Sequence, residues 1–473
     1  MSLLKNSAWS FMDKVISRGL NFVVFIYLAT VLTPADFGTV AVARIFIDYL
    51  DSLSDQGLFF ALVQRKRLTK KHIDTSLLLL VGLASALALV ISILATLIGQ
   101  FYENSELVNV IQILALMMVV NAINRVPYAL IVREQNYKKL FMNNFFVSFG
   151  NASVGISMAL NGFGVWALVG QQFAHAFLGL IALTLATGWR PGLQISKRAA
   201  LVLYRFSFKL VIDQQFQFFS KKVDEFLVSL LYGLSTLGMF TLAKKFLLPL
   251  MDLLLGSFTR VVFSSLSRLQ NKPKQFEESI ALYLRWVLSF LGPVVATLAT
   301  TADLFIPMLF GEKWSGVELV VSVLVATVFV SGISAILHQG FIATGNTSAV
   351  LRSNTWRIVV FLLSVSFLTR FGLVGVGVAV FLKDIVGLCI DVYYVKSRLR
   401  IDLRNIFHNI LKGTFPAMFA CVAVLYFRFS HSFDNYSNTN LLVICAVSAF
   451  FASSITILLF ERKLVKRIFW KYT

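Results

Sequence analysis

Charged and amide side chains recur at helical spacing inside long apolar runs of this sequence. Lys14, Arg18 and Asn21 follow one another at intervals of four and three residues, so they share one face of a predicted helix at 7–32. In the next run, Arg44 precedes Asp48 by four residues. Cations held in an apolar setting attract anions, and carboxylates in such a setting can carry protons or other ions. The pattern therefore predicts a binding site for an anionic substrate.

The same kind of pattern returns about 200 residues later, around Lys221 and Lys245. The predicted substrate-binding cations are Lys14, Arg18, Arg44, Lys221, Lys222, Lys244, Lys245 and Arg260. The predicted polar contacts to substrate are Asn21, Gln214 and Gln217, and the carboxylates that could couple an ion are Asp48, Asp51 and Asp252. For each charged residue the alternative is a structural ion pair, as the spacing of Arg44 and Asp48 allows.

The composition requires a membrane setting for these charges. Of the 473 residues, 58% are hydrophobic and 14% are charged, far from the roughly 25% charged residues of an average soluble domain. A soluble enzyme, a disordered chain and a secreted disulfide scaffold are thereby excluded. The three cysteines lie within apolar runs without metal or redox spacing, so we interpret them as packing residues.

Apolar runs separated by charge clusters predict fourteen membrane-spanning helices. Their ranges are 7–32, 37–63, 74–100, 107–131, 141–160, 163–187, 204–232, 237–265, 279–306, 317–344, 350–369, 373–395, 413–428 and 441–460. Because Asp13, Lys14 and Arg18 interrupt the first run, we interpret it as a retained span and not as a cleaved signal peptide.

The loops predict the orientation. With the N-terminus in the cytoplasm, nearly all loop lysines and arginines fall on the inner side, and the outer side carries only Lys313, Arg370 and Arg428. This asymmetry follows the positive-inside rule and predicts that both termini are cytoplasmic. All loops are short, so any function is expected among the helices.

Two segments 200 residues apart resemble one another. Residues 37–46 (FGTVAVARIF) align with residues 237–246 (LGMFTLAKKF), matching a glycine, an alanine and a cation. Six helices separate the copies, and an even number makes them parallel, as in transporters built from two similar bundles. The predicted fold is therefore all-α and polytopic, with two parallel six-helix repeats and two additional C-terminal helices. The predicted domains are 1–200, 201–396, and 397–473, the last comprising an amphipathic connector and the final two helices.

Several short motifs resemble those of bacterial polysaccharide flippases of the Wzx and polysaccharide-synthase type. Residues 32–38 (LTPADFG) resemble the turn L-x-P-x-x-F-G, and residues 61–65 (ALVQR) resemble A-L-[IV]-Q-R. Residues 235–243, 263–268 and 309–314 resemble S-x-L-G-x-Y-x-x-A, F-P-x-[LI]-S-R and L-F-G-x-x-W, with Phe240 in place of tyrosine and Ser264 in place of proline. The resemblance covers residues 1 to about 396 and is nearest to the colanic-acid and teichuronic-acid exporter subgroup.

This resemblance implies a fold like that of the multidrug and toxin extruders, and a flippase of the bacterial cytoplasmic (inner) membrane. Such a protein moves an oligosaccharide linked through pyrophosphate to a polyprenol, by alternating access through a cationic central cavity. It implies no cofactor, although a proton or sodium gradient could drive transport. The implied partners are the lipid-linked oligosaccharide, the lipid bilayer, and the polysaccharide polymerase and chain-length machinery.

Two other functions compete with this interpretation. A drug or organic-ion exporter of the same fold would favour an acidic or aromatic cavity, whereas the chain carries a formal net charge of +20. A membrane enzyme such as a polymerase or ligase would need a large outer loop or a loop carboxylate site, and the sequence shows neither. No phosphate-binding loop for ATP is present, and no soluble face exists on which a nucleic acid would bind.

Overall fold

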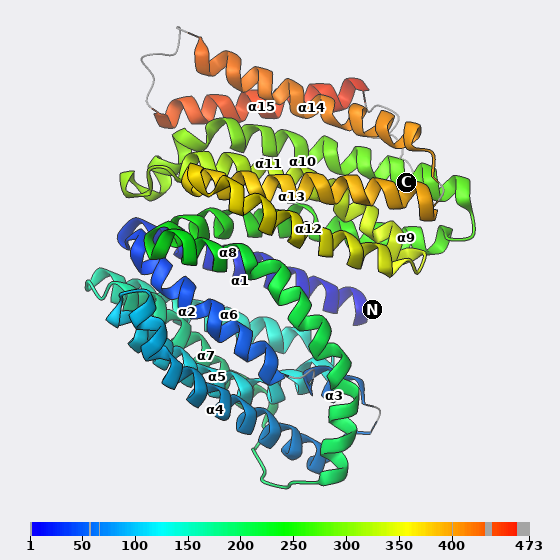
Figure 1. Ribbon diagram of the computed structural model, residues 1–473. Helices are drawn as coiled ribbons and strands as arrows, with labels where there is room; N and C mark the ends of the chain where they lie inside the picture. Colours follow the sequence, from blue (N-terminus) through cyan, green and yellow to red (C-terminus); the bar gives the residue numbers. More distant parts are fainter. Residues whose placement is uncertain (1, 56–57, 66, 400, 431–437, 461–473) are drawn as a thin grey trace. The chain divides into compact units, whose positions relative to one another are not determined.

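The computed structural model describes residues 2–55, 58–65, 67–399, 401–430 and 438–460. The elements of the part it describes are helices joined by connecting segments, and Figure 1 shows the helices. They are α1 (Ser2–Val31), α2 (Pro34–Asp55), α3 (Leu58–Gln64), α4 (Lys70–Phe101), α5 (Ser105–Arg133), α6 (Tyr137–Leu160), α7 (Val165–Thr187), α8 (Lys197–Leu254), α9 (Gly256–Leu269), α10 (Pro273–Phe310), α11 (Val317–Ala343), α12 (Thr347–Leu368), α13 (Gly372–Tyr394), α14 (Leu403–Phe429) and α15 (Asn438–Phe460). Three short turns of helix, η1 (Glu312–Trp314), η2 (Thr369–Phe371) and η3 (Val395–Leu399), lie between them.

The chain forms two compact units, residues 1–242 and 243–473. In the first unit α4 packs on α5, α6 on α7, and α1 on α6. In the second unit α10 packs on both α11 and α14, while α12 packs on α13. The predicted domain boundaries near 200 and 396 were drawn from the sequence repeat. The division into compact units does not test them, so they stay predictions.

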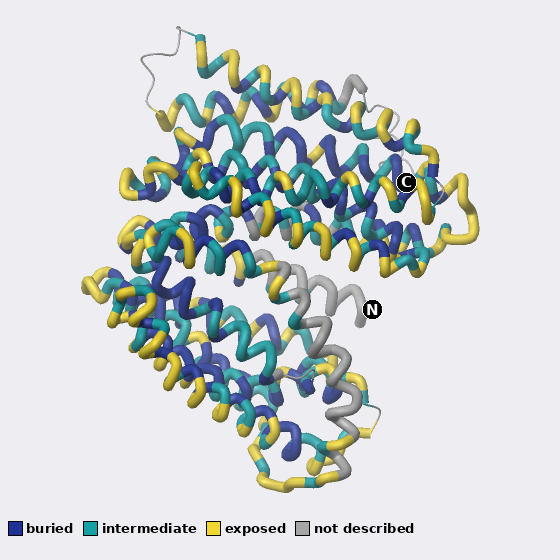
Figure 2. The backbone as a smooth tube through the Cα atoms, viewed as in Figure 1, coloured by how far each residue is buried: buried dark blue, intermediate teal, exposed yellow. Residues whose placement is uncertain are grey.

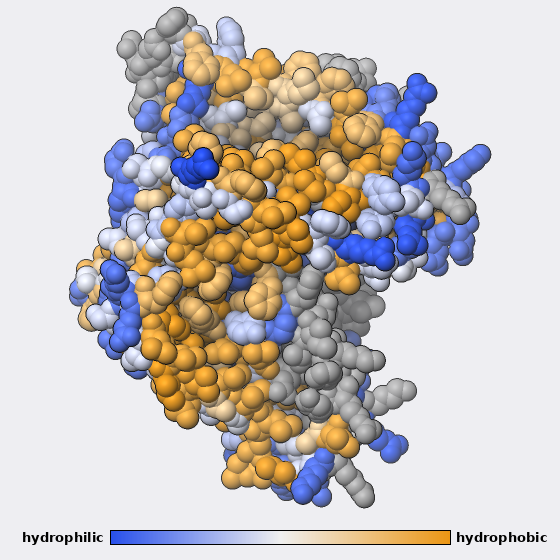
Figure 3. All heavy atoms as spheres, in the orientation of Figure 1, coloured by the Kyte–Doolittle hydropathy of each residue, from blue (hydrophilic) through white to orange (hydrophobic). Residues whose placement is uncertain are grey.

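The helices confirm the prediction of a multi-pass membrane protein. Within the described residues, nine helical segments are long and apolar enough to cross a membrane. In each unit apolar side chains cover most of the face in view, and hydrophilic side chains gather toward the helix ends (Figure 3). Buried positions line the sides on which neighbouring helices meet, as along α10 and α11 (Figure 2). Exposed apolar side chains on the other sides are those that would face lipid.

Helix ends differ from the predicted ranges where glycine permits an unusual backbone. The helix predicted at 204–232 and the first part of the one predicted at 237–265 are joined in α8, which has a non-helical backbone at Gly233, with φ 77° and ψ −173°; the rest of the second helix forms α9. Glycine adopts this conformation without steric cost, so a single residue replaces the predicted loop. The helix predicted at 37–63 is described as α2 and α3, on either side of residues 56–57, which lie outside the described residues.

The segment that begins α2 shows how the turn motif works. Thr33 donates its backbone N–H to the Asp36 carboxylate (2.8 Å), and the Asp36 N–H donates in return to Thr33 Oγ1 (3.2 Å). This reciprocal cap satisfies two donors at the helix start, and Pro34 occupies the first helical position, where no N–H is needed. The motif therefore fixes where α2 begins.

Corresponding residues of the two repeats meet inside the first unit. A Cβ atom built on Gly38 would lie 1.8 Å from the carbonyl oxygen of Leu234, and one built on Gly238 would lie 1.8 Å from the carbonyl oxygen of Pro34. The two contacts are related by the same offset of 200 residues as the sequence repeat. Only glycine allows backbones to approach this closely. The aligned glycines thus build a locally two-fold contact between α2 and α8.

Candidate functional site: two sets of charged residues

Helices α2 and α8 carry two ion pairs in the first unit. Arg44 pairs with Asp48 of the same helix at 2.7 Å, with side chains 38% and 28% exposed. On α8, Lys222 pairs with Glu225 at 2.6 Å. Asp48 also interacts electrostatically with Lys222 and Glu225, so the two pairs are neighbours. The predicted cations Arg44 and Lys222 are therefore neutralised by carboxylates.

A third pair joins α2 to α5. The Arg125 guanidinium lies 2.9 Å from Asp51 Oδ2 and donates to Ser54 Oγ at 3.0 Å. At the residue next to Asp51, the Gln215 side chain of α8 donates to Ser52 Oγ at 2.9 Å. We call the six charged residues of these pairs the α2 ladder: Arg44, Asp48, Asp51, Arg125, Lys222 and Glu225. It contains three cations and three carboxylates, and so is balanced in formal charge.

The other predicted site residues fall into three groups. The side chains of Arg18, Lys221, Lys245 and Arg260 are exposed, and that of Lys244 is half-buried. Asn21 donates to Ser148 Oγ at 3.5 Å. The side chains of Lys14, Gln214, Gln217 and Asp252 lie outside the described residues. The cationic binding site and its central cavity stay predictions. Among the side chains of the first unit that the structure describes, Arg18 and Lys221 are predicted cations at exposed positions.

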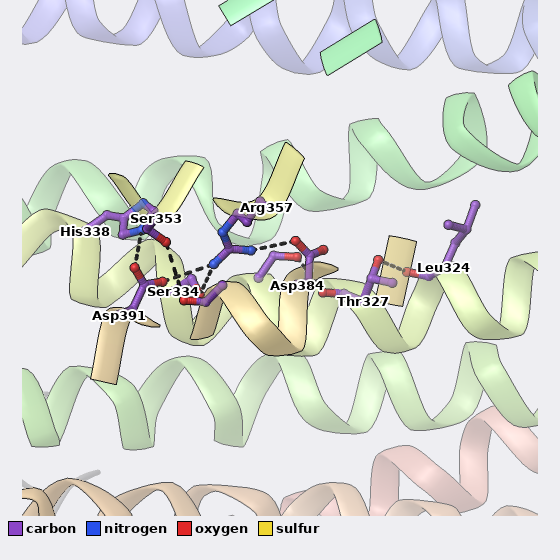
Figure 4. Close-up of polar contacts among 10 residues, drawn as sticks. Leu324, Thr327, Ser334, His338, Ser353, Arg357, Asp384 and Asp391 are labelled. Atoms are coloured by element: carbon purple, nitrogen blue, oxygen red, sulfur yellow. Dashed lines mark hydrogen bonds and ion pairs between the residues drawn. The ribbon is translucent and has the colours of Figure 1, made fainter. Parts of the chain in front are cut away.

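The second unit contains a buried set of charges, drawn in Figure 4. Arg357 of α12 donates to Asp384 Oδ1 at 2.6 Å and to Asp391 Oδ2 at 3.0 Å, both on α13. His338 of α11 lies with Nε2 3.0 Å from the other oxygen of Asp391. Arg357 also donates to Ser334 Oγ of α11 at 2.7 Å. We call His338, Arg357, Asp384 and Asp391 the α13 cluster.

The α13 cluster is shielded from solvent. The side chain of Asp391 is 0% exposed, and those of Arg357 and Asp384 are 12% and 13% exposed. Gly387, between the two aspartates, provides the space for the guanidinium, because a Cβ there would lie 2.3 Å from Arg357 Cζ. Charges that are buried to this degree are stable only when they are paired and hydrogen-bonded.

Sequence reasoning did not single out Asp391. It named Arg44, Asp48 and Asp51 because these residues lie within one obvious polar stripe. Asp391 stands in an apolar stretch near the end of its helix, and its partners come from two other helices. The usable signal was the spacing of Asp384 and Asp391, seven residues or two turns apart on one face.

Neither set resembles a metal centre. Among the described residues, no group of three or more histidine, cysteine or acidic side chains is arranged to hold a metal ion. Both sets instead combine carboxylates with guanidinium or ammonium groups. Such an arrangement can bind protons or exchange ion-pair partners, and it offers no covalent nucleophile.

Comparison with known proteins identifies the family. Residues 27–319, more than half of the chain, match the family described as "Polysaccharide biosynthesis protein". The chain belongs to this family. The matched region contains the α2 ladder and the reciprocal glycine contact, whereas the whole α13 cluster lies beyond it.

Individual relatives in the polysaccharide biosynthesis family agree with this membership. The chain is 27% identical to the succinoglycan biosynthesis transport protein ExoT of Rhizobium meliloti, over 66% of this chain and 64% of ExoT. It is 24% identical to the lipopolysaccharide biosynthesis protein WzxC of Escherichia coli, again over 66% and 64%. The teichuronic acid biosynthesis protein TuaB of Bacillus subtilis is 20% identical over 68% of this chain and 67% of TuaB. The matches thus span slightly less than two thirds of ExoT and WzxC.

Solved structures support the predicted fold of this family member. The lipid II flippase MurJ, in an inward closed conformation, matches with a TM-score of 0.75 and 14% identity, over 98% of this chain and 100% of MurJ. An inward-facing multidrug resistance transporter of the MATE family matches with a TM-score of 0.62, over 84% of this chain and 98% of that transporter. At this identity the likeness concerns the fold, which confirms the predicted MATE-like architecture.

Proposed function

We propose that this protein is a flippase that moves a polyprenyl-pyrophosphate-linked oligosaccharide across the bacterial cytoplasmic membrane for surface polysaccharide synthesis. Family membership is the observation that carries the proposal. ExoT is named as a transport protein of succinoglycan biosynthesis, and WzxC and TuaB are named for the synthesis of other polysaccharides. The fold shared with MurJ is consistent with transport and not with covalent catalysis.

The charges of the first unit suit such a substrate. A pyrophosphate carries negative charge that must be compensated wherever it leaves water. Arg18 and Lys221 present exposed side chains that a ligand can reach. We infer that Arg18 and Lys221 contact the pyrophosphate or acidic sugars first. The balanced α2 ladder would then serve as a reserve of cations that can exchange partners.

The orientation and partners form part of the same proposal. The inner-side excess of lysine and arginine in the loops supports cytoplasmic termini. The lipid-linked oligosaccharide would therefore enter from the inner leaflet and leave to the outer leaflet, where a polymerase and its chain-length machinery would receive it. A drug exporter would have the same fold, as the MATE transporter shows. The relatives ExoT, WzxC and TuaB, however, are all named for polysaccharide synthesis.

The proposal is tested in the bacterium that carries the gene. Deleting the gene should abolish the surface polysaccharide and cause the polyprenyl-pyrophosphate-linked oligosaccharide to accumulate in membrane extracts. The wild-type gene should restore export, whereas the double variant Arg18→Gln/Lys221→Gln should reduce it at least about tenfold, because two charge-assisted contacts of about 1.5–3 kcal/mol are lost. Export is measured as surface polysaccharide per unit of membrane-inserted protein.

The matched control removes the same charge from other exposed positions. Lys274→Gln/Arg370→Gln replaces two exposed cations of the second unit, neither of them predicted to bind substrate. This variant should export normally. Equal loss in both double variants would show an effect of net charge, and normal polysaccharide in the deletion strain would overturn the proposed function.

A further inference from the structure

We propose that His338 and Asp391 form a proton-binding dyad, and that its occupancy decides how the Arg357 guanidinium is shared between Asp391 and Asp384. The dyad was not among the residues predicted to couple an ion, which were Asp48, Asp51 and Asp252. Its role in transport rests on the proposed function, whereas proton binding itself does not.

The first argument is the geometry of the imidazole. His338 Nε2 lies 3.0 Å from Asp391 Oδ1, so a neutral His338 donates its N–H to this carboxylate. The other ring nitrogen, Nδ1, is then the basic atom that accepts a proton. An imidazolium formed in this way is stabilised by direct contact with the fully buried carboxylate of Asp391. His338 and Asp391 can therefore take up one proton without any other group changing its charge.

The second argument is that one guanidinium is shared by two carboxylates. Asp384 and Asp391 are seven residues apart, about 10.5 Å along the helix axis, and Arg357 reaches both. While His338 is neutral, Arg357 is the cation in contact with Asp391. Once His338 is protonated, it provides that compensation itself, and Arg357 can move toward Asp384. Arg357 Nε is buried without a hydrogen-bond partner in the described structure, so one of its donors is available to a new acceptor.

The dyad lies near the ends of two helices, and the side chain of His338 is its partly exposed member, at 17%. Asp391 lies three residues before the end of α13, and His338 lies five residues before the end of α11. The loops that follow both helices are predicted to be cytoplasmic. Asp384 lies about two turns deeper. A proton that binds His338 from the cytoplasmic side would thus change the ion pair at Asp384, two turns deeper in α13, because Arg357 moves toward it.

The other charged groups near the dyad are more distant from His338 than Asp391 is, are paired elsewhere, or are exposed. Lys383 Nζ lies 5.5 Å from the centre of the Phe361 ring, and its charge opposes protonation of His338. Lys383 is eight residues from Asp391, about 12 Å along the helix axis, whereas the Asp391 carboxylate contacts the imidazole of His338.

The charged residues of the neighbouring helices have other partners. On α10, Glu277 contacts Asn405 and Asp303 pairs with Arg428, both residues of α14. At the other end of α11, Glu318 caps Gly316, and Arg285 of α10 has its backbone against Gly413 of α14. Other charged residues of the neighbouring elements are exposed: Arg260, Arg268, Lys274, Glu278, Arg352, Arg370, Lys396 and Arg398.

The direct test is a titration of histidine signals by nuclear magnetic resonance. The full chain is labelled at its five histidines and held in lipid nanodiscs, and the His338 signal is assigned from its absence in His338→Gln. We expect the His338 signal to report reversible protonation, and its proton affinity to fall at least tenfold in Asp391→Asn because the contact with the carboxylate is lost. His408→Gln, at an exposed histidine of α14, should leave the His338 titration unchanged. A His338 signal that does not titrate, or that titrates identically in Asp391→Asn, would overturn the proposal.

The second test concerns coupling. The lipid-linked oligosaccharide extracted from the deletion strain is fluorescently labelled and its flipping is measured in proteoliposomes with and without a pH gradient. The ratio of the two rates should exceed one for wild type and for His408→Gln, and should fall to about one for His338→Gln. A ratio for His338→Gln that equals the wild-type ratio would overturn the coupling role. No flipping by wild type under either condition would instead count against the proposed function, and the titration would still decide proton binding.

Discussion

The α2 ladder and the α13 cluster solve the problem of intramembrane charge in different ways. The ladder pairs each cation with one carboxylate, and its cations remain partly exposed, Arg44 at 38%, Lys222 at 28% and Arg125 at 19%. In the cluster, one guanidinium serves two carboxylates, one of them fully buried, and a histidine completes the set. A balanced, accessible set can exchange partners with an anionic ligand. A buried set that shares a single guanidinium responds instead to the addition or loss of a proton.

Removing the central cation of each set should give the largest difference in stability between the ladder and the cluster. Arg357→Met leaves two buried carboxylates without their guanidinium and should destabilise the protein by about 3–5 kcal/mol. Arg44→Met leaves a partly exposed carboxylate that Lys222 still approaches, and its cost should be about 1 kcal/mol or less. Thermal unfolding of the detergent-solubilised variants measures both effects. Equal shifts in melting temperature would show that burial does not distinguish the two sets.

The triple variant Arg357→Met/Asp384→Asn/Asp391→Asn is the control for that prediction. It replaces the whole set of charges by neutral side chains of similar size. Most of the lost stability should return, because no buried charge is left without a partner. Failure to recover stability would assign the loss to packing and not to charge.

A methyl group beside Arg357 tests how tightly the cluster is enclosed. In Gly387→Ala the new Cβ would lie 2.3 Å from Arg357 Cζ and Nε, so the guanidinium must move away from one of its aspartates. We expect a loss of about 1–3 kcal/mol, measured by the same unfolding experiment. The matched control is Gly82→Ala on α4, where nothing lies within 4 Å of the added Cβ, and this change should stabilise its helix by up to about 1 kcal/mol. A Gly387→Ala variant as stable as Gly82→Ala would mean that the guanidinium moves without cost.

The smallest effect is expected from exchanging the charges of a ladder pair. In Arg44→Asp/Asp48→Arg the two residues remain one helical turn apart and can form the same pair in reverse, so stability should change by no more than about 1 kcal/mol. The corresponding exchange in the cluster, Arg357→Asp/Asp384→Arg, puts a carboxylate beside Asp391 in place of the guanidinium and should be clearly destabilising. If both exchanges are tolerated, the cluster is as adaptable as the ladder, and the contrast between them is wrong.

Much of this protein could be predicted from its sequence. Long apolar runs predict membrane helices because a bilayer leaves the backbone few other ways to satisfy its hydrogen bonds. Within the described residues, nine helical segments are long and apolar enough to do so, which confirms the multi-pass character. The sequence similarity at an offset of 200 residues was visible in the alignment of Gly38 with Gly238. The family motifs gave the fold that MurJ shares. The pairing of Arg44 with Asp48 was one of the alternatives considered, since both lie on one helix.

The partners of the remaining charges were decided by the tertiary structure alone. Arg125 with Asp51, and Arg357 with Asp384 and Asp391, each join different helices. The alignment of Gly38 with Gly238 was visible in the sequence. The close approach of the α2 and α8 backbones at these glycines was not. Periodicity reports which residues share a face of one helix, because neighbours three and four apart are fixed by local geometry. It contains no information on which face of another helix packs there, and the partners of a buried charge depend on that packing.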